Sequence, residues 1–524
     1  MSDRTPTSAL GGYLSAAAPG GWFATRDHKR IGLMFAAWTT GALLLGLMFG
    51  ILPMVRSLGG MEDDAGGVLR ALTYQRLILV FMFLAPAIPA VLGHFLLPLQ
   101  LGARNLALPV FSLWSLRLYA AGLVLALASV LAGGVSFGWT MPTPLSLTGD
   151  GVFWLLAAGL ACSGFSWFLA GVNIIVTVHH HRAPGLGFFR MPLLSWSLYL
   201  AAYLLVMSGL ILAIIVLYLA GARGTGRGLF GPDADPLLWL NYFWFATRPV
   251  LFFALVPAAG VVFDVVAGIG RKAVTGYRMV VGSMIALLAL SVVTWGVHLS
   301  GYGQAPHLTF VFSVLSILGA VPVALIAYSL LATLHRGAIA CAAPTTFTVA
   351  FVLHAGIASV MGLFLASPAL GAYLNTTMFA TAQIDYVMWG GVLGAFLAGL
   401  HFWWPKMTGR PVNHPVGRFG GILYLIGVNL AFFPQVVQGV GGAPVDLGAL
   451  EPGPTGLTEI AALGWLFLVS GLIVAIGNLV GSLWGKEAAG GNPWGACTLE
   501  WTTASPPPVD NFAAAPAGAD PYGN

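Results

Sequence analysis

Long apolar runs separated by short polar segments dominate this chain and constrain its fold more than any other feature. A helix that crosses a bilayer needs about 20 mostly apolar residues. Twelve segments meet this requirement, with approximate limits at residues 31–55, 77–99, 113–133, 152–177, 195–221, 238–268, 275–298, 308–334, 345–366, 378–403, 419–440 and 458–485. Only 7% of the residues are charged, whereas a soluble domain carries about 25%. The runs are continuous and do not alternate, which disfavours a β-barrel. The sequence therefore predicts an all-α, polytopic membrane protein with twelve transmembrane helices.

The basic residues predict how these helices are oriented. If the N-terminus is cytoplasmic, most of the 22 lysine and arginine residues fall in cytoplasmic segments, as the positive-inside bias requires. An even number of spans then places the C-terminus on the same side. We expect a cytoplasmic segment over 1–30, a membrane domain over 31–486 and a cytoplasmic tail over 487–524. The tail is rich in proline, alanine and glycine, so we expect it to be extended or disordered.

The same bias accounts for the net charge of +5, so the charge does not indicate a nucleic-acid partner. The expected location is the inner (plasma) membrane of a bacterium, in contact with lipid.

Cysteine and histidine patterns do not by themselves indicate a metal site. The three cysteines are scattered without CxxC spacing and are expected to be core or loop residues: Cys162, Cys341 and Cys497. A run of histidines over 179–181 binds metals adventitiously, but adjacent helix positions do not face one point. His354 and His401 lie inside predicted spans and are expected to be hydrogen-bonded interior residues.

Short motifs in a fixed order resemble one known family. They are TRDHKRIG (25–32), LGHFLLPLQLGARNLALP (92–109), RAPGLGFFRMPLLSWS (182–197), FWFATRPV (243–250), WGVHLSGYG (295–303), the span 375–410, GVNLAFFPQ (427–435) and NPWGACTLEWTTASPPPVDNF (492–512). Together they resemble subunit I of the haem-copper oxidases, of the cytochrome c oxidase type, nearly from end to end. The resemblance implies a twelve-helix oxidase fold, two haems, a copper ion, cytochrome c oxidation with oxygen reduction, and neighbouring subunits of a respiratory complex.

The positions at which this family holds its metals carry other residues here. By the resemblance, the two low-spin haem ligands fall on Gln75 and Asp385, the high-spin ligand on Gln383, and the copper ligands on Arg248, Val297 and His298. Imidazole suits iron and copper, but only His298 supplies it. An amide is a poor haem ligand, a guanidinium has no free lone pair, and valine has no donor. We therefore predict no haem or copper site with confidence, and His298 is only a weak metal candidate.

Other functional positions implied by the resemblance have also changed. The copper-linked tyrosine falls on Phe252, three proton-path residues on Asn105, Val250 and Ile326, the propionate-binding arginines on Val445 and Asp446, and a metal-binding pair on Asn375 and Thr376. His94 replaces an asparagine of the family motif. Their joint loss indicates that redox chemistry and proton pumping were lost together.

Three ionisable residues fall inside predicted spans: Arg248, Asp264 and Asp385. Such residues are costly in a bilayer and are functional candidates by default. One hypothesis pairs Arg248 with Asp385 across the space vacated by haem, together with Gln383 and Gln75. The plainer alternative, which we favour, satisfies each separately through backbone carbonyls, water or snorkelling.

The sequence leaves three functions open. The first is a pseudo-enzyme, a non-catalytic subunit or scaffold of a respiratory membrane complex, which docks through its loops and through TLEWTTASPPPVDNF (498–512). The second is subunit I of a divergent terminal oxidase. The third is a conduit for ions, quinone or lipid through the emptied haem cavity, lined by Arg248, Asp264 and Asp385.

Overall fold

Each of the twelve predicted spans is helical in the computed structural model. The structure describes residues 21–58, 65–148, 152–337, 340–445, 456–485, 487–514, 516–518 and 522. Every regular element within these residues is a helix. Among them, eleven helices are long and apolar enough to cross a membrane. The twelfth predicted span corresponds to the 17-residue helix α8 (Tyr277–Val293), followed by the short helix η7 (Trp295–Leu299). The chain is therefore an all-α, multi-pass membrane protein.

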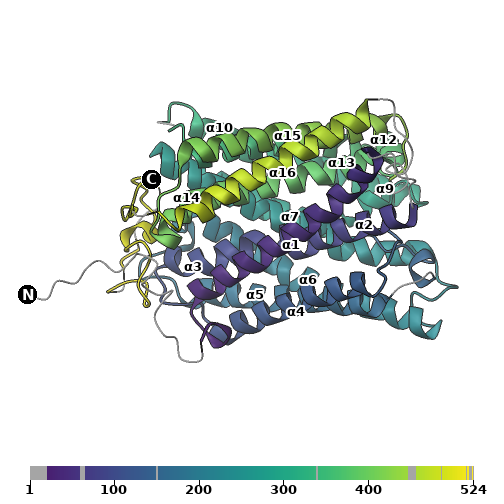
Figure 1. The fold of residues 1–524 in the computed structure, drawn as a ribbon, viewed down its shortest axis with the longest axis horizontal. Helices are drawn as coiled ribbons and strands as arrows, with labels where there is room; N and C mark the ends of the chain where they lie inside the picture. The colour runs from purple at the N-terminus through teal and green to yellow at the C-terminus, as the bar shows by residue number, and fades with distance from the viewer. Residues whose placement is uncertain are drawn as a thin grey trace, which may run out of the picture.

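Most spans are single, uninterrupted helices. They are α1 (His28–Leu58), α4 (Pro109–Leu131), α5 (Phe153–His180), α6 (Leu193–Thr225), α7 (Pro236–Gly270), α11 (Ala343–Ala366), α15 (His414–Val440) and α16 (Leu457–Ser482). Figure 1 shows them as one bundle, in which the start of α1 and the C-terminal segment lie at the same end. An even number of crossings requires this arrangement. The structure does not contain a bilayer, so the cytoplasmic assignment of that end stays a prediction.

Three spans are built from consecutive helical pieces. The second span joins α2 (Ala65–Leu77), the π-helical segments η3 (Ile78–Leu84) and η4 (Ala87–Gly93), and α3 (His94–Leu101). The tenth joins α13 (Met378–Asp385), the π-helical η8 (Tyr386–Val392) and α14 (Leu393–Thr408). The eighth divides into α9 (Pro306–Leu318) and α10 (Ala320–Leu334), and α12 (Pro368–Leu374) precedes the tenth. π-Helical turns are rare overall, and those that occur often lie near functional sites.

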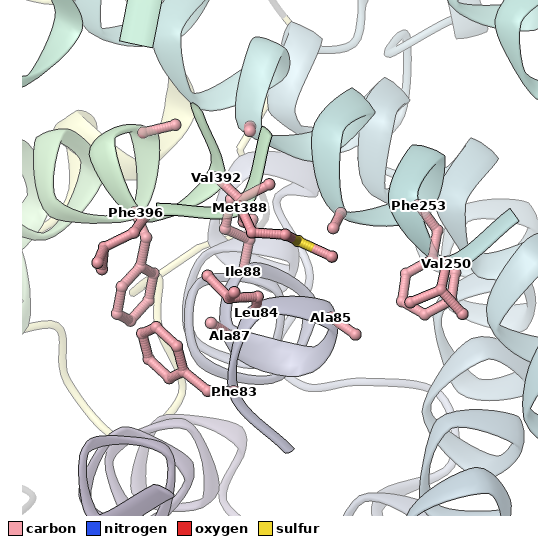
Figure 2. Packing of buried hydrophobic residues seen from close by; sticks show 14 of the residues in the cluster. Phe83, Leu84, Ala85, Ala87, Ile88, Val250, Phe253, Met388, Val392 and Phe396 are labelled. Carbon is pink, nitrogen blue, oxygen red and sulfur yellow. The ribbon is translucent and has the colours of Figure 1, made fainter. Parts of the chain in front are cut away.

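The second, sixth and tenth spans form the centre of the bundle. Their most apolar windows are 100%, 89% and 94% buried, whereas the window of the α9–α10 span is only 17% buried. Figure 2 shows Phe83 and Ile88 of the second span close to Met388, Val392 and Phe396 of the tenth. The rings of Phe83 and Phe396 meet edge to face with centroids 5.9 Å apart, a favourable geometry for an aromatic pair. These three spans contribute the positions at which the resemblance places most metal ligands.

Small residues allow the peripheral helices to approach closely. A Cβ atom added to Gly164 of α5 would collide with the carbonyl oxygen of Gly209 on α6, and the reverse substitution would collide in the same way. Close packing at small residues replaces the hydrophobic effect as the source of helix association within lipid. Substitution of either glycine would force these two helices apart.

The C-terminal segment packs against the end of the bundle, so the expectation of an extended or disordered tail is wrong for its described residues. The Lys406 ammonium donates to the backbone carbonyls of Gly491 (3.0 Å) and Thr503 (2.7 Å). The Trp494 indole N–H donates to the carbonyl of Phe402. Asn511 is fully buried, and its amide nitrogen lies 2.8 Å from the carbonyl oxygen of Ala103. Composition predicted disorder because it does not reveal these specific polar contacts.

Candidate functional site

An ion pair links the two central spans beside the positions where the resemblance implies the low-spin haem ligands: it joins Asp385, one of these positions, to Arg76, the neighbour of the other. The Arg76 guanidinium donates from Nη2 to Oδ2 of Asp385 over 3.3 Å. The two side chains are only 17% and 11% exposed. Arg76 comes from α2 and Asp385 from the end of α13, and a π-helical segment follows directly or within two residues of each. The pair therefore connects the second and tenth spans where an iron would have connected them.

This contact corrects two expectations. Asp385 pairs with Arg76 and not with Arg248, so the hypothesis of an Arg248–Asp385 pair is wrong. We expected the second span to start at residue 77, because the residues just before it are polar. That limit places Arg76 in the preceding loop. The helix in fact begins at Ala65, which places Arg76 inside it.

Gln75 points away from this pair, toward the first span. A Cβ atom added to Gly50 of α1 would lie 2.7 Å from the Gln75 amide nitrogen. Gln75 is 6% exposed. It therefore lies at the contact between the first and second spans and does not join a polar cluster with Arg248.

Arg248 contacts a histidine instead of a carboxylate. Its Nη1 lies 2.7 Å from Nε2 of His298. Arginine can only donate, so Nε2 accepts and the proton of the neutral imidazole resides on Nδ1. The imidazole stacks on Trp244 with ring centroids 4.0 Å apart, and the guanidinium carbon lies 5.3 Å from the centre of the Phe252 ring. The copper positions of the resemblance thus hold a guanidinium–imidazole contact.

A cavity of about 320 Å³ adjoins this contact. Arg248, Val297, His298, Phe252 and Gln383 all line it. The Gln383 amide donates weakly to the carbonyl of Ala358 over 3.4 Å, and its Oε1 has no hydrogen-bond partner. The fold therefore gathers the high-spin haem and copper positions around one space, as the resemblance implies, but with different side chains.

These side chains do not fit an iron porphyrin or a copper ion. The Arg248 guanidinium would repel a metal cation. It also occupies Nε2 of His298, which is the only histidine among the implied ligand positions. Asp385 is engaged by Arg76, and amide side chains are weak ligands for haem iron. Within the described residues, no group of three or more His, Cys, Asp or Glu side chains is arranged to hold a metal ion. We therefore derive no redox step at this site.

The remaining histidines of the bundle make structural contacts. His354 Nε2 lies 2.9 Å from the Asn429 amide nitrogen, and His401 Nδ1 lies 2.8 Å from the carbonyl of Leu397. Both are buried, so the expectation of hydrogen-bonded interior residues is confirmed. His94 is buried against Phe35 with ring centroids 5.0 Å apart. His179 is partnered by the Tyr199 hydroxyl near the exposed end of α5. All three cysteines are free, and Cys341 and Cys497 are exposed.

The other positions singled out by the resemblance are scattered through the fold. Asn375 is buried, and its amide nitrogen lies within hydrogen-bond distance of the Gly371 carbonyl (2.9 Å) and the Ser300 hydroxyl (2.8 Å). Asn105 donates to the carbonyl of Arg26. The Val445 backbone N–H donates to the carbonyl of Thr376. Val250 is in the core, and Ile326 packs against its edge. Asp446 lies outside the described residues.

Asp264 belongs to a buried polar cluster that the sequence did not reveal. Its Oδ2 accepts from the Gln100 amide over 2.9 Å, and its Oδ1 accepts from the Tyr522 hydroxyl. The same Gln100 amide nitrogen lies 3.2 Å from Oε1 of Glu500, which also accepts from the Trp403 indole over 3.1 Å. Glu500 and Tyr522 come from the tail, so no signal within the predicted spans could have identified them.

Burial raises the pKa of the Glu500 carboxyl above its usual value, while donation from Gln100 opposes the shift. Burial and the adjacent Asp264 carboxylate raise the pKa of the Tyr522 hydroxyl well above its ordinary value. The cluster is therefore a set of hydrogen-bonded carboxyl groups that joins the tail to the bundle.

The three intramembrane ionisable residues consequently lie in three different places. Sixteen residues of α7 separate Arg248 from Asp264, which corresponds to about 24 Å of helix. Of the three, only Arg248 lines the cavity. Asp385 is held by Arg76 and Asp264 by Gln100 and the tail. The cavity beside Arg248 is therefore not lined by Asp264 or Asp385.

Comparison with known proteins gives consistent matches over most of the chain. The family model described as cytochrome c and quinol oxidase polypeptide I matches residues 30–473. A probable cytochrome c oxidase subunit 1-beta of Nocardia farcinica is 32% identical over 505 residues, which cover 93% of this chain and 84% of the relative. A cytochrome c oxidase subunit 1 of a Bacillus species is 31% identical over 507 residues, covering 94% and 82% respectively.

A solved structure supports the same fold. A heme-copper terminal oxidase dimer determined by cryo-electron microscopy has a chain that superposes with a TM-score of 0.73. The match covers 88% of this chain and 85% of the solved one, at 16% sequence identity. At that identity the likeness concerns the arrangement of the helices and not the chemistry of the site.

Proposed function

Because this chain belongs to the family of subunit I of the cytochrome c and quinol oxidases, we propose that it is a subunit I homologue without redox centres. It is not catalytic on its own, and it serves as an integral scaffold of a respiratory membrane complex. The carrying observation is the Arg76–Asp385 ion pair between the second and tenth spans. An ion pair at this position needs the space between the two spans that a haem would occupy.

The second metal region supports the same conclusion. Arg248 stands at a copper position and donates to His298, the one histidine preserved there. A protonated guanidinium at a copper site opposes cation binding. A change of side chains in both regions is harder to reconcile with a variant oxidase than loss of a single ligand.

The scaffold role accounts for the preserved fold and for the preserved C-terminal segment. The tail segment over 492–512 packs on the end of the bundle through Glu500, Trp494 and Asn511. In members of this family the polypeptide is one subunit of an assembly, and a preserved fold with an altered site fits selection for contacts with neighbouring subunits. Function follows from the site and not from the fold. The expected setting is the plasma membrane of a bacterium, with both termini in the cytoplasm.

The test is purification of the tagged chain from its native membrane in mild detergent, followed by subunit identification and an assay of cytochrome c oxidation. We expect other respiratory membrane subunits to co-purify in fixed proportion. We also expect that substitution of Asp385 by asparagine changes assembly without changing any turnover of the complex that a separate catalytic subunit supplies. Purification of the chain alone, without partner subunits, would contradict the scaffold.

A divergent terminal oxidase is the second candidate, and the identity of 32% to a probable cytochrome c oxidase subunit favours it. In that case the purified chain itself oxidises reduced cytochrome c, consumes oxygen in proportion, and loses this activity when His298 is replaced. The scaffold proposal expects none of these results.

A further inference from the structure

The positive charge of Arg248 has no anion beside it. Within the described residues, the ion pairs are Lys29–Asp27 and Arg76–Asp385, and neither involves Arg248. Its Nη1 donates to His298, which is a neutral acceptor in that contact. Its Nε is buried without a hydrogen-bond partner. Arginine keeps its proton in proteins, and an unpaired charge at membrane depth is costly. The fold therefore leaves the Arg248 cation without an internal anion.

The available edge of Arg248 has the geometry that carboxylates use. Because Nη1 is occupied by His298, the Nε–H and one Nη2–H remain as two parallel donors. This edge forms bidentate contacts with the two oxygens of a carboxylate, which are among the stronger charge-assisted hydrogen bonds. Arg248 lines the cavity, and because its Nε is buried, the bidentate contact requires a rotation of the guanidinium that turns this edge toward the ligand.

The rest of the cavity is suited to a hydrocarbon chain. Its volume of about 320 Å³ is at the small end of ordinary ligand pockets. The walls are mostly aliphatic side chains of α8, α10 and α11, including Leu287, Val323 and Leu363. Ser316 also lines the cavity, and its hydroxyl is buried without a hydrogen-bond partner. One charged group against an apolar wall requires a ligand with one anionic head and an apolar body.

The cavity communicates with the outer surface of the bundle. Val360 and Leu363 line it and are 54% and 41% exposed, so part of the cavity wall belongs to the outer face of α11. The opposite wall is the α9–α10 span, which is only 17% buried in its apolar window and is divided at Gly319, itself a lining residue. An acyl chain could thus enter sideways from the bilayer between α10 and α11.

We infer that this cavity binds a single-chain fatty acid from the membrane, with its carboxylate on Arg248 and its chain along α10 and α11. A monoacyl carboxylate carries the one negative charge that the site lacks, and it matches the small volume better than a two-chain phospholipid. The inference rests on the proposed function in one respect, namely that no porphyrin fills the same space.

The test uses palmitate that carries a photoreactive diazirine on its acyl chain. Purified wild-type protein in detergent is incubated with this probe, irradiated and analysed by mass spectrometry of the intact chain and of its peptides. We expect saturable labelling within α10 or α11, competition by oleate, and no competition by the uncharged methyl ester of palmitate. Equal competition by the ester would overturn the inference, because the head group would then not be recognised.

Two variants examine the two halves of the site. Arg248→Gln removes the cation, and we expect about tenfold or greater loss of affinity, since one lost charge-assisted contact exceeds 1.4 kcal/mol. Gly362→Leu fills the cavity, because a Cβ atom at Gly362 meets only the Gln383 amide nitrogen, at 3.8 Å. This variant should abolish labelling while leaving Arg248 in place. The matched control is the double variant Arg76→Gln with Asp385→Asn, which removes an arginine together with its ion-pair partner and should leave labelling unchanged.

The outcomes separate the possible ligands and the two proposals. Unchanged labelling of Arg248→Gln overturns the fatty-acid site, and so does competition by lysophosphatidylglycerol or chloride but not by oleate. An absorption spectrum is recorded on the same sample. Bound haem would contradict the proposed function, whereas absence of both haem and labelling would contradict only the fatty-acid site. If Arg248→Gln does not fold, Gly362→Leu and the methyl ester still decide the result.

Discussion

Arg76 and Arg248 both lie inside this helical bundle, and their surroundings differ in one decisive respect. Arg76 has a carboxylate partner, Asp385, which belongs to a different span. Arg248 has only the neutral imidazole of His298 and an apolar cavity beside it. The first charge is neutralised within the protein, and the second requires an anion from outside. In this account the two arginines have different roles: Arg76 joins two helices, and Arg248 binds a ligand.

This comparison gives a rule that can be tested across the molecule. Removing a polar group that has internal partners should destabilise the fold, because its partners are left buried and unsatisfied. Removing a charge that has no internal counter-ion, as at Arg248, should cost little. The following predictions are ordered by the size of the expected effect.

The largest effect is expected for Asp385→Asn, which makes Arg76 resemble Arg248. An uncompensated buried charge costs about 3 kcal/mol or more, so the melting temperature in detergent should fall sharply. The double variant Arg76→Gln with Asp385→Asn should recover much of the loss, because no unpaired charge remains. Equal melting temperatures for the wild type and the single variant would show that the ion pair does not join the spans.

A smaller but clear loss is expected for Asn511→Ala, which extends the rule to the tail. Asn511 is buried and contacts His28 and the carbonyl of Ala103. Its backbone φ of 64° is tolerated by asparagine better than by alanine. Loss of these contacts should cost about 2 kcal/mol and increase cleavage within the tail by a protease. Val509→Ala is the control, since Val509 is 62% exposed.

A third effect concerns pH and is expected for Glu500→Gln. Burial raises the pKa of this carboxyl in the folded protein, while the unfolded chain titrates near about 4.3. Stability from this group is therefore full below the unfolded pKa and is lost as pH rises through the folded pKa. The variant has no carboxyl to titrate, so its melting temperature should depend less on pH than that of the wild type. Parallel pH profiles would contradict this assignment.

The smallest effect is expected for Arg248→Gln in protein freed of lipid. No internal anion loses its partner, so the melting temperature should stay within about 1 °C of the wild type or rise, as is usual when an unpaired buried charge is removed. Addition of palmitate should raise the melting temperature of the wild type and not that of the variant. A large destabilisation by Arg248→Gln would mean that the guanidinium has a structural role.

The arginines also show which parts of the structure could be predicted from the sequence. The twelve spans and their order followed from apolar length, and helix limits such as Leu193–Thr225 agree with the expected 195–221 within a few residues. Membrane helices are well predicted because the bilayer forces every backbone group into internal hydrogen bonds. The flanking motifs fix the register by which the resemblance assigns the haem and copper positions, and that assignment stays a prediction.

The partners of the buried charges could not be predicted, for physical reasons. Hydropathy placed the start of the second span at residue 77 and left Arg76 in the preceding loop, because polar residues within a helix resemble a span boundary. The rotation of each helix about its axis decides whether Asp385 meets Arg76 or Arg248, and apolar composition around the whole helix gives no such signal. Glu500 lies in a segment whose proline and glycine content suggested disorder, although its buried contacts are made with Gln100 and Trp403.

The most direct test of the central claim is the ratio of haem to polypeptide in the protein purified from its native membrane, measured by absorption spectroscopy and by extraction of the haem, with copper determined on the same sample. The account predicts no Soret band that co-purifies with this chain and no copper in fixed proportion to it. One or two haems per chain, lost when Asp385 or Gln383 is substituted, would contradict it.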